Sequence, residues 1–313
     1  MHTVFAGGVG ASRFLQGLVQ VVAPASVTVI SNTGDDVEMF GLHVSPDVDI
    51  VIYALAGAVN PETGWGLAGD TFAVMEALRR YGYDRWFKLG DRDLATAVHR
   101  TRLLRAGTPM HEIIAGLATA WGLACTVLPM SNQRIETRIT TPVGELPFQD
   151  YMVRLRTEVD VTGIAFAGAE AAKPAPGVIE AIRDSETVIL APSNPLVSIG
   201  PILAVPGVRD ALASTRAVRA AISPIIAGQV VKGPAAKMMT TLGHEVSALG
   251  VARMYRGLVD VMVIDEQDRT LAPAVEALGV RCLVTDTMMT SPARKAELAR
   301  DVLAACAGGK AAG

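Results

Sequence analysis

Short apolar runs rich in β-branched residues alternate with longer amphipathic segments along most of this chain. Each run is followed by a helix or turn pattern, and the runs are TVFA, VTVIS, TVILA, AAISPII and DVMVI. A run that is apolar at every position, such as 188–191, is typical of a parallel strand that helices cover on both faces. The pattern therefore predicts an α/β fold with a doubly wound, mainly parallel, Rossmann-like sheet, whose ligands gather at the carboxyl ends of the strands.

Two segments depart from this alternation. Residues 71–122 have a mainly helical pattern, in which Thr108 and Pro109 suit a helix start and Gly122 suits a helix end. Residues 134–154 alternate between polar and apolar around TPVGELP, which predicts a small β-hairpin. We therefore expect a single α/β domain over residues 1–313, with a helical insertion at about 71–122 and a hairpin at about 134–154.

Composition narrows the possible partners. The formal net charge of −3 gives no sign of the basic surface that nucleic acids or anionic membranes require. No apolar run approaches the length of a membrane span, and the first residues do not resemble a signal peptide, so a cytoplasmic location is expected. The three cysteines and five histidines have no metal-binding spacing, which argues against a zinc enzyme.

A glycine-rich loop directly follows the first apolar run. In AGGVGASRF, Gly7, Gly8 and Gly10 allow backbone N–H groups to approach a phosphate at the start of a helix. The loop is not a dinucleotide fingerprint, because Arg13 stands where the third glycine belongs, and it lacks the lysine of a P-loop. From the loop alone, a phosphate site and a plain tight turn both remain open.

Acidic residues follow the second apolar run. Asp35 and Asp36 lie just beyond it in SNTGDD, and Asp49 follows at the start of a predicted helix. Asp35 and Asp49 could share Mg²⁺, which prefers one or two carboxylates together with phosphate oxygens and water; a solvated turn is the alternative. Asp47 is explained without a function, because an acid stabilises the positive end of a helix.

Two further polar segments are candidates for substrate binding. LGDRDLAT places Asp91 and Arg92 in a loop before a helix, where helix capping and a local ion pair are the plain explanations. LAPSNPLVSIGPI follows a buried run and offers uncharged groups that could bind a base or sugar edge, although turn formation around its prolines is the alternative. These groups are Ser193, Asn194 and Ser198.

Taken together, these segments resemble one family, in order and over nearly the whole chain. GGVGASRFLQGL, SNTGDD, GLHVSPDVD, GWGLAGDT, LGDRDLAT, LAPSNPLVSIGPIL and SPIIAG are similar to the 2-phospho-L-lactate transferases and phosphoenolpyruvate transferases of coenzyme F420 biosynthesis. The resemblance implies an Mg²⁺-dependent transferase. Such an enzyme moves a phosphorylated three-carbon acid from its guanosine diphosphate-activated form to the deazaflavin FO and releases GMP. It also implies a homodimer.

The resemblance implies roles for particular residues. Asp35 and Asp49 become the metal ligands, and Asp35, Asp36 and Arg92 the catalytic residues, with Asp35 or Asp36 accepting the hydroxyl proton. The implied substrate-binding residues are Gly7, Gly8, Gly10, Arg13, Asn32, Trp65, Gly66, Asp91, Ser193, Asn194 and Ser198. Within this set, the glycine loop and the serine and asparagine side chains would hold the guanosine diphosphate part of the donor, and Trp65 could stack on the deazaflavin.

Two alternatives compete with the transferase. A non-catalytic, sugar-nucleotide-binding regulator of the gluconeogenesis-factor type shares a glycine loop and a double-acid turn. However, Asp36 leads here into VEMFGLHVSPDVD instead of a Gly- and Ser-rich run. An NAD-dependent oxidoreductase requires an acid at the end of the second strand, where Ser31 and Asn32 stand. The donor stays open between phosphoenolpyruvate, 2-phospho-L-lactate and phosphoglycerate.

Overall fold

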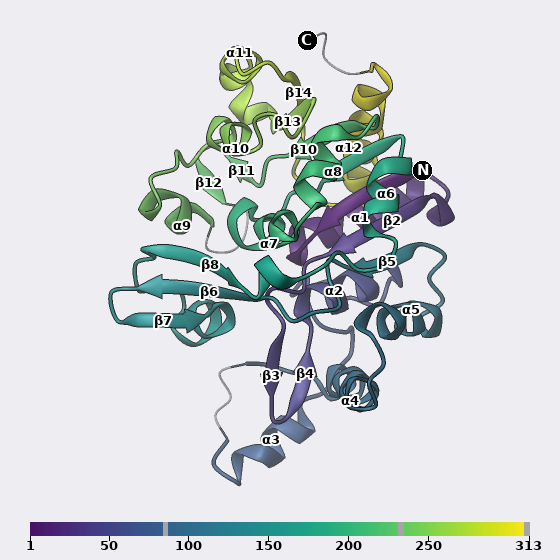
Figure 1. Ribbon diagram of the computed structural model, residues 1–313, viewed down its shortest axis with the longest axis vertical. Helices are drawn as coiled ribbons and strands as arrows, with labels where there is room; N and C mark the ends of the chain where they lie inside the picture. The colour runs from purple at the N-terminus through teal and green to yellow at the C-terminus, as the bar shows by residue number, and fades with distance from the viewer. Residues whose placement is uncertain (84–86, 231–234, 310–313) are drawn as a thin grey trace.

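A seven-stranded sheet forms the centre of the computed structural model, which describes residues 1–83, 87–230 and 235–309 (Figure 1). Its strand order is β14-β13-β10-β9-β1-β2-β5, and every neighbouring pair is parallel. The strands are β1 (His2–Ala6), β2 (Val27–Ser31), β5 (Thr126–Pro129), β9 (Thr187–Leu190), β10 (Val218–Ile222), β13 (Val261–Asp265) and β14 (Arg281–Thr285). The predicted doubly wound, parallel α/β fold is confirmed.

Helices cover both faces of this sheet because successive side chains of a strand point to opposite faces. Val4 and Ala6 belong to one apolar core, and Phe5, between them, belongs to the other. The first core contains α1 (Gly8–Val21), α2 (Pro46–Leu55), α5 (Met110–Ala120) and α12 (Pro292–Ala307). The second contains α6 (Val178–Asp184), α7 (Gly200–Ala204), α8 (Val208–Ser214), α9 (Ala235–Thr241), α10 (Ala248–Met254) and α11 (Ala272–Glu276).

The helical insertion contains α3 (Ala73–Arg79), α4 (Asp91–Arg105) and α5, as its pattern predicts. α4 packs against a two-stranded hairpin, β3 (Val37–Met39) and β4 (Leu42–Val44), and the two share a small apolar core with α3. Figure 1 shows α3 at one end of the long axis of the molecule, beyond the tips of β3 and β4.

A second antiparallel sheet lies beside the main one, with the strand order β7-β6-β8 (Figure 1). The predicted hairpin is formed by β6 (Glu136–Thr141) and β7 (Gly144–Pro147). β8 (Gly163–Ala167), the next strand along the chain, does not join the main sheet but pairs antiparallel with β6. A short pair, β11 (Ile225–Ile226) and β12 (Gln229–Val230), precedes α9.

The order of the main sheet reverses between β1 and β9. The chain runs from β1 through α1 to β2 on one side, and β9 later returns to the other side of β1. Loops that leave two such strands diverge, and the crevice between them is where open α/β sheets bind ligands. In the described part of the chain no single helix could span a membrane; one bent pair, Pro195–Ala204 with Val208–Ser214, passes by length and composition only.

Candidate functional site

A cavity of about 1100 Å³ lies at the carboxyl edge of the main sheet, at this reversal point. Loops after β1, β2, β9, β10 and β14 line it, together with the start of α2, residues 148–156 and part of the helical insertion. The structure brings most of the predicted site residues together here: Gly7, Gly8, Gly10, Arg13, Asp35, Asp49, Trp65, Gly66, Ser193, Asn194 and Ser198. Four others do not line the cavity: Asn32, Asp36, Asp91 and Arg92.

Different structural constraints require glycine at the three glycine positions of the loop. Gly8 has a φ of +70°, in the left-handed region that favours glycine, whereas Gly7 is extended. A Cβ on Gly7 would lie 2.7 Å from the Cβ of Ser198, and one on Gly10 would lie 2.0 Å from the carbonyl oxygen of Pro192. Gly10 therefore lets the loops after β1 and β9 pack together, while Gly7 and Gly8 leave bare backbone at the start of α1.

Ser193 joins these two loops. Its hydroxyl donates to the carbonyl of Gly7 over 2.8 Å and accepts from the Gly7 N–H at 3.4 Å. Asn194 caps the π-helical turn Pro195–Ile199, because its side-chain oxygen accepts from the N–H groups of Leu196 and Val197. Both residues thus shape the loop and also face the cavity.

Asp35 is buried at the floor of the cavity with only 5% of its surface exposed. Its Oδ1 atom has no hydrogen-bond partner in the described part of the chain. Burial, and after it the charge of Asp47, raises the pKa of Asp35 well above the ordinary carboxyl value. The site therefore holds a carboxylate that is costly to ionise without a cation.

Asp47 is a functional candidate that the sequence patterns missed. They explained it as a helix-start acid, but its carboxylate lies beside the glycine loop, 2.8 Å from where a Cβ on Gly7 would be. Burial raises the pKa of Asp47 to about 6. Asn32 supports this arrangement from behind, donating to Asp47 over 2.9 Å and accepting from the Gly34 N–H over 2.8 Å.

Asp49 faces the cavity but is already paired. Arg100, a fully buried residue of α4, forms an ion pair with its Oδ1 and donates to its Oδ2 over 3.1 Å. This pair joins the helical insertion to α2. Asp93, two residues beyond the predicted Asp91, also lines the cavity, and burial followed by the charges of Asp49 and Asp70 raises its pKa to about 6.

Asp91 and Arg92, which do not line the cavity, form hydrogen bonds that hold neighbouring segments in place. Asp91 caps α3, accepting from the N–H groups of Ala73 and Val74 over 2.9 Å each and from the Thr71 hydroxyl over 2.6 Å. These bonds, that of Thr71 first, lower the pKa of Asp91. Arg92 donates to the carbonyl of Ala68 over 3.0 Å.

Asp36 is held within its own segment. Its Oδ1 accepts from the Ser45 hydroxyl at 2.5 Å, and its Oδ2 lies 2.8 Å from Nε2 of His43. Both carboxylate oxygens are therefore engaged before any substrate arrives. The prediction that Asp36 is catalytic stays a prediction, as do those for Asp91 and Arg92.

Positive side chains complete the lining of the cavity. They are Arg13, Lys88, Arg154 and Arg156, and none of them is paired with a carboxylate of the described residues. Trp65, which is 37% exposed, adds an aromatic face. A cavity with acids and unpaired cations suits a ligand that carries several negative charges together with a metal cation.

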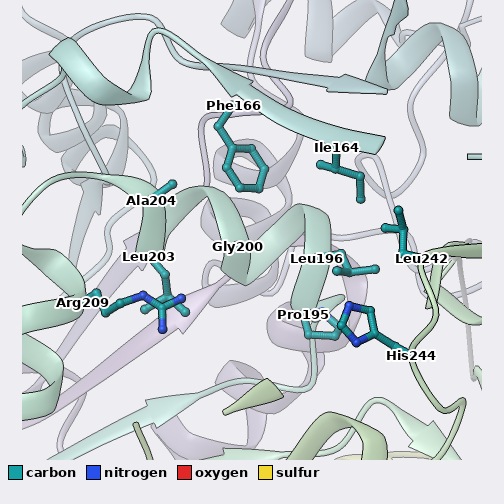
Figure 2. Close-up of a pocket in the computed structure, with 10 residues that line it drawn as sticks. All are labelled: Ile164, Phe166, Pro195, Leu196, Gly200, Leu203, Ala204, Arg209, Leu242 and His244. Carbon is teal, nitrogen blue, oxygen red and sulfur yellow. The ribbon is translucent and has the colours of Figure 1, made fainter. Parts of the chain in front are cut away.

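A second cavity, of about 460 Å³, lies on the other side of the Pro195–Ile199 turn (Figure 2). Figure 2 shows Phe166 and Ile164 of β8 facing α7, with Arg209 and His244 at opposite sides of the view. This cavity is mostly apolar, has no carboxylate in its lining and contains none of the predicted site residues. The larger cavity is therefore the candidate site.

Residues 1–83, 87–230 and 235–309 contain no metal site formed by protein side chains alone. No three His, Cys, Asp or Glu side chains meet there in a metal-binding group. A cation at Asp35 and Asp47 would need oxygens from a ligand and from water, which is how Mg²⁺ is commonly bound.

Comparisons with known proteins identify the family of this chain. The model of the family described as 2-phospho-L-lactate transferase CofD matches residues 3–290. A Streptomyces griseus protein named phosphoenolpyruvate transferase is 45% identical over 306 residues and covers 96% of each chain. A Methanosarcina mazei protein named 2-phospho-L-lactate transferase is 38% identical over 302 residues, which cover 96% of this chain and 99% of that protein.

A solved structure supports the fold alone. The crystal structure of a UPF0052 family member from Bacillus halodurans has a TM-score of 0.61 and 18% identity, covering 96% of this chain and 98% of that one. The function class comes instead from the family match, which extends over most of the chain, and from relatives at 38% and 45% identity. The chain therefore belongs to the 2-phospho-L-lactate transferase CofD family and is a transferase of phosphorus-containing groups.

Proposed function

We propose that this enzyme transfers phosphoenolpyruvate or 2-phospho-L-lactate from its guanosine diphosphate-activated form to the terminal ribityl hydroxyl of FO, with release of GMP. The product would be dehydro coenzyme F420-0 or coenzyme F420-0. One observation carries the proposal: a single cavity joins the glycine loop, the buried carboxylates and the exposed Trp65. Its volume of about 1100 Å³ is at the upper end of ordinary ligand pockets and supports binding of two substrates side by side.

The donor diphosphate is assigned to the start of α1. This helix has 14 residues, so the N–H groups of Gly7 and Gly8 lie at the positive end of a full helix dipole. Arg13 extends from the second turn into the same cavity and would form charge-assisted hydrogen bonds with phosphate oxygens. Asn194 and Ser198 provide neutral groups on the facing loop.

The carboxylates fit a divalent cation. Asp35 has a buried oxygen without a partner among the described residues, and its strongest charged neighbour is Asp47, which also has a raised pKa. We propose that Asp35 and Asp47 hold Mg²⁺, which would neutralise charge on the phosphate oxygens. Asp49 also remains a predicted ligand, although Arg100 engages both of its oxygens.

The transfer itself requires a proton acceptor and precise placement. The FO hydroxyl forms a bond to the phosphorus next to the three-carbon acid, the bond to the GMP oxygen breaks, and the hydroxyl proton is lost. Asp35 or Asp36 was predicted to accept the proton, and the cavity adds Asp93 as a third candidate. With a pKa of about 6, Asp93 is ionised at neutral pH and close to the range of an efficient general base.

The assay of this proposal combines the protein with FO, Mg²⁺ and one guanosine diphosphate-activated acid at a time. We expect release of GMP and a phosphorylated deazaflavin, both identified by chromatography and mass spectrometry. A competition between the phosphoenolpyruvate, phospholactate and phosphoglycerate donors, read by product mass, would identify the natural one. Absence of GMP release with every donor would refute the proposal, and binding of a sugar nucleotide without turnover would favour the regulator alternative.

Replacement of Arg13 tests the diphosphate assignment. Arg13→Ala should raise the KM for the activated donor at least about tenfold, because hydrogen bonds to a charged group contribute more than neutral ones. Arg134→Ala serves as the control, since Arg134 is 61% exposed and absent from the cavity lining. Steady-state kinetics at saturating FO measure both. A donor KM that stays at the wild-type value in Arg13→Ala would remove Arg13 from the phosphate site.

A further inference from the structure

We infer that Arg156 binds an oxyanion of the activated donor and that Lys237 positions it through a strained turn. The inference rests on the proposed function and assigns one subsite within it. Arg156 lies in the segment that follows the π-helical turn Asp150–Arg154, and its side chain lines the large cavity. No family motif singled out either residue in the sequence.

The backbone at Arg156 is unusual. Arg156 has a φ of +49° and Thr157 a φ of +60°, and they are the only adjacent non-glycine residues with positive φ in the described ranges. The other two such residues, Phe40 and Ala227, each precede a glycine in a tight hairpin turn. A left-handed conformation is unfavourable for residues with a Cβ atom, and such strain persists where the surroundings hold it, often at functional sites.

Lys237 of α9 holds this turn from outside. Its Nζ donates to the carbonyl of Thr157 over 2.8 Å and to that of Glu158 over 2.7 Å, and it lies 3.4 Å from the Asp160 carboxylate. The Thr157 N–H also donates over 3.0 Å to the carbonyl of Tyr151, a fully buried residue. Two elements 80 residues apart in the chain therefore fix the left-handed pair.

The Arg156 side chain has no partner among the described residues. No described residue accepts a hydrogen bond from the Arg156 guanidinium or forms an ion pair with it, although it faces a cavity that contains four carboxylates. The same segment contacts the Asp35 loop, since Gln149 donates to the carbonyl of Asp35 over 3.3 Å. A guanidinium that lines the same cavity as Asp35 and has no partner among the described residues suits bidentate binding of a phosphate or a carboxylate, and the activated donor carries both.

Replacement by glycine separates binding from strain. Arg156→Gly removes the guanidinium, while glycine adopts the same φ without a steric penalty. We expect the KM for the donor to rise at least about tenfold, kcat to change less than about threefold, and Tm to equal or exceed that of the wild type. Ala227→Gly is the matched control, because it relieves the same backbone strain outside the cavity lining and should leave the donor KM unchanged.

Replacement of Lys237 tests the positioning role. Lys237→Met keeps the guanidinium but removes both hydrogen bonds to the turn. We expect the donor KM to rise in the same direction as in Arg156→Gly, and Tm to fall instead of rising. A lower Tm with an unchanged donor KM would show that Lys237 is structural only and would overturn this part of the inference.

Binding measurements identify the oxyanion without turnover. Calorimetric titration of the wild type and Arg156→Gly with GDP alone and with phosphoenolpyruvate alone, in Mg²⁺, provides two arms. A loss confined to phosphoenolpyruvate assigns Arg156 to the three-carbon acid, and an equal loss for GDP assigns it to the diphosphate. Equal affinities of both proteins for both anions would overturn the inference. A loss of binding in an enzyme that shows no GMP release would leave it standing while the proposed function fails.

Discussion

Asp35→Asn is expected to lower turnover by about 100-fold or more while making the metal-free protein more stable to heat. The loss of turnover follows from removal of a charged group at the proposed cation, where single electrostatic contributions to rate are of this size. The gain in stability follows from the structure, because the native protein buries a charged carboxylate beside Asp47, with no partner for its Oδ1 among the described residues, and asparagine removes that charge. An uncompensated buried group costs about 1–3 kcal/mol, and more when it is charged, which corresponds to a rise in Tm of roughly 2 °C or more.

The pH dependence of the rise in Tm shows whether ionisation of Asp35 causes it. The pKa of Asp35 is raised in the folded state, so ionisation favours the unfolded state and its cost is present only at pH values above the ordinary carboxyl pKa. The Tm difference between Asp35→Asn and the wild type should therefore be largest at neutral pH and above. It should decrease as the pH falls and disappear below about pH 4, where Asp35 becomes protonated in both states.

Two measurements check this result. Scanning calorimetry without Mg²⁺ gives Tm, and the GMP-release assay gives turnover. Asp184→Asn, an exposed substitution at the end of α6, is the control and should change the free energy of unfolding by less than about 0.5 kcal/mol. Wild-type turnover in Asp35→Asn would exclude Asp35 from the chemistry. A Tm of Asp35→Asn equal to or below that of the wild type would refute the proposal that the buried charge of Asp35 destabilises the native protein.

Arg100→Met should produce the largest loss of stability among single substitutions at the site. Arg100 is fully buried and forms an ion pair with Asp49, whose side chain is 13% exposed, so methionine would leave a mostly buried carboxylate without this partner. Breaking such a pair from one side costs about 3–5 kcal/mol. Urea unfolding should show this as a lower midpoint with a similar m-value.

The matched control is Arg294→Met, which breaks the 2.9 Å ion pair with Glu297 on α12, where the two side chains are 54% and 49% exposed. Exposed pairs contribute about 1 kcal/mol or less. The double variant Asp49→Asn with Arg100→Met should recover part of the loss, because no charge then remains unpaired. If Arg100→Met is as stable as the wild type, the pair does not stabilise the packing of the helical insertion against α2.

The strands that the pattern predicted and those that it missed differ in position within the sheet. β1, β2, β9, β10 and β13 lie inside the sheet and are apolar on both faces, which makes them visible as continuous runs. β5 and β14 are its two edges. Burial alternates along β5, and every residue of β14 is half-buried, so neither has the signal of a central strand.

At the site, the sequence predicted which residues have suitable chemistry, but it did not predict which of them lie next to one another in space. The glycine loop and Asp35 follow strand ends in the chain, and the parallel fold places strand ends at one edge. Asp47 was explained as a helix-start acid because nothing local shows that the helix begins beside Gly7. Asp91 stood in a recognisable family segment, yet its hydrogen bonds cap α3.

The amino-acid sequence by itself determined the α/β class, the helical insertion, the family and most of the residues that line the cavity, because these depend on local periodicity and on short ordered motifs. Only the tertiary structure decided that Asp47 joins Asp35, that Arg100 neutralises Asp49 and that Lys237 holds the turn at Arg156. Strand pairing and helix packing bring these residues together. Their burial then determines their pKa values and decides which of their polar atoms have a partner. Burial and proximity are properties of the folded chain, and no spacing along the sequence encodes them.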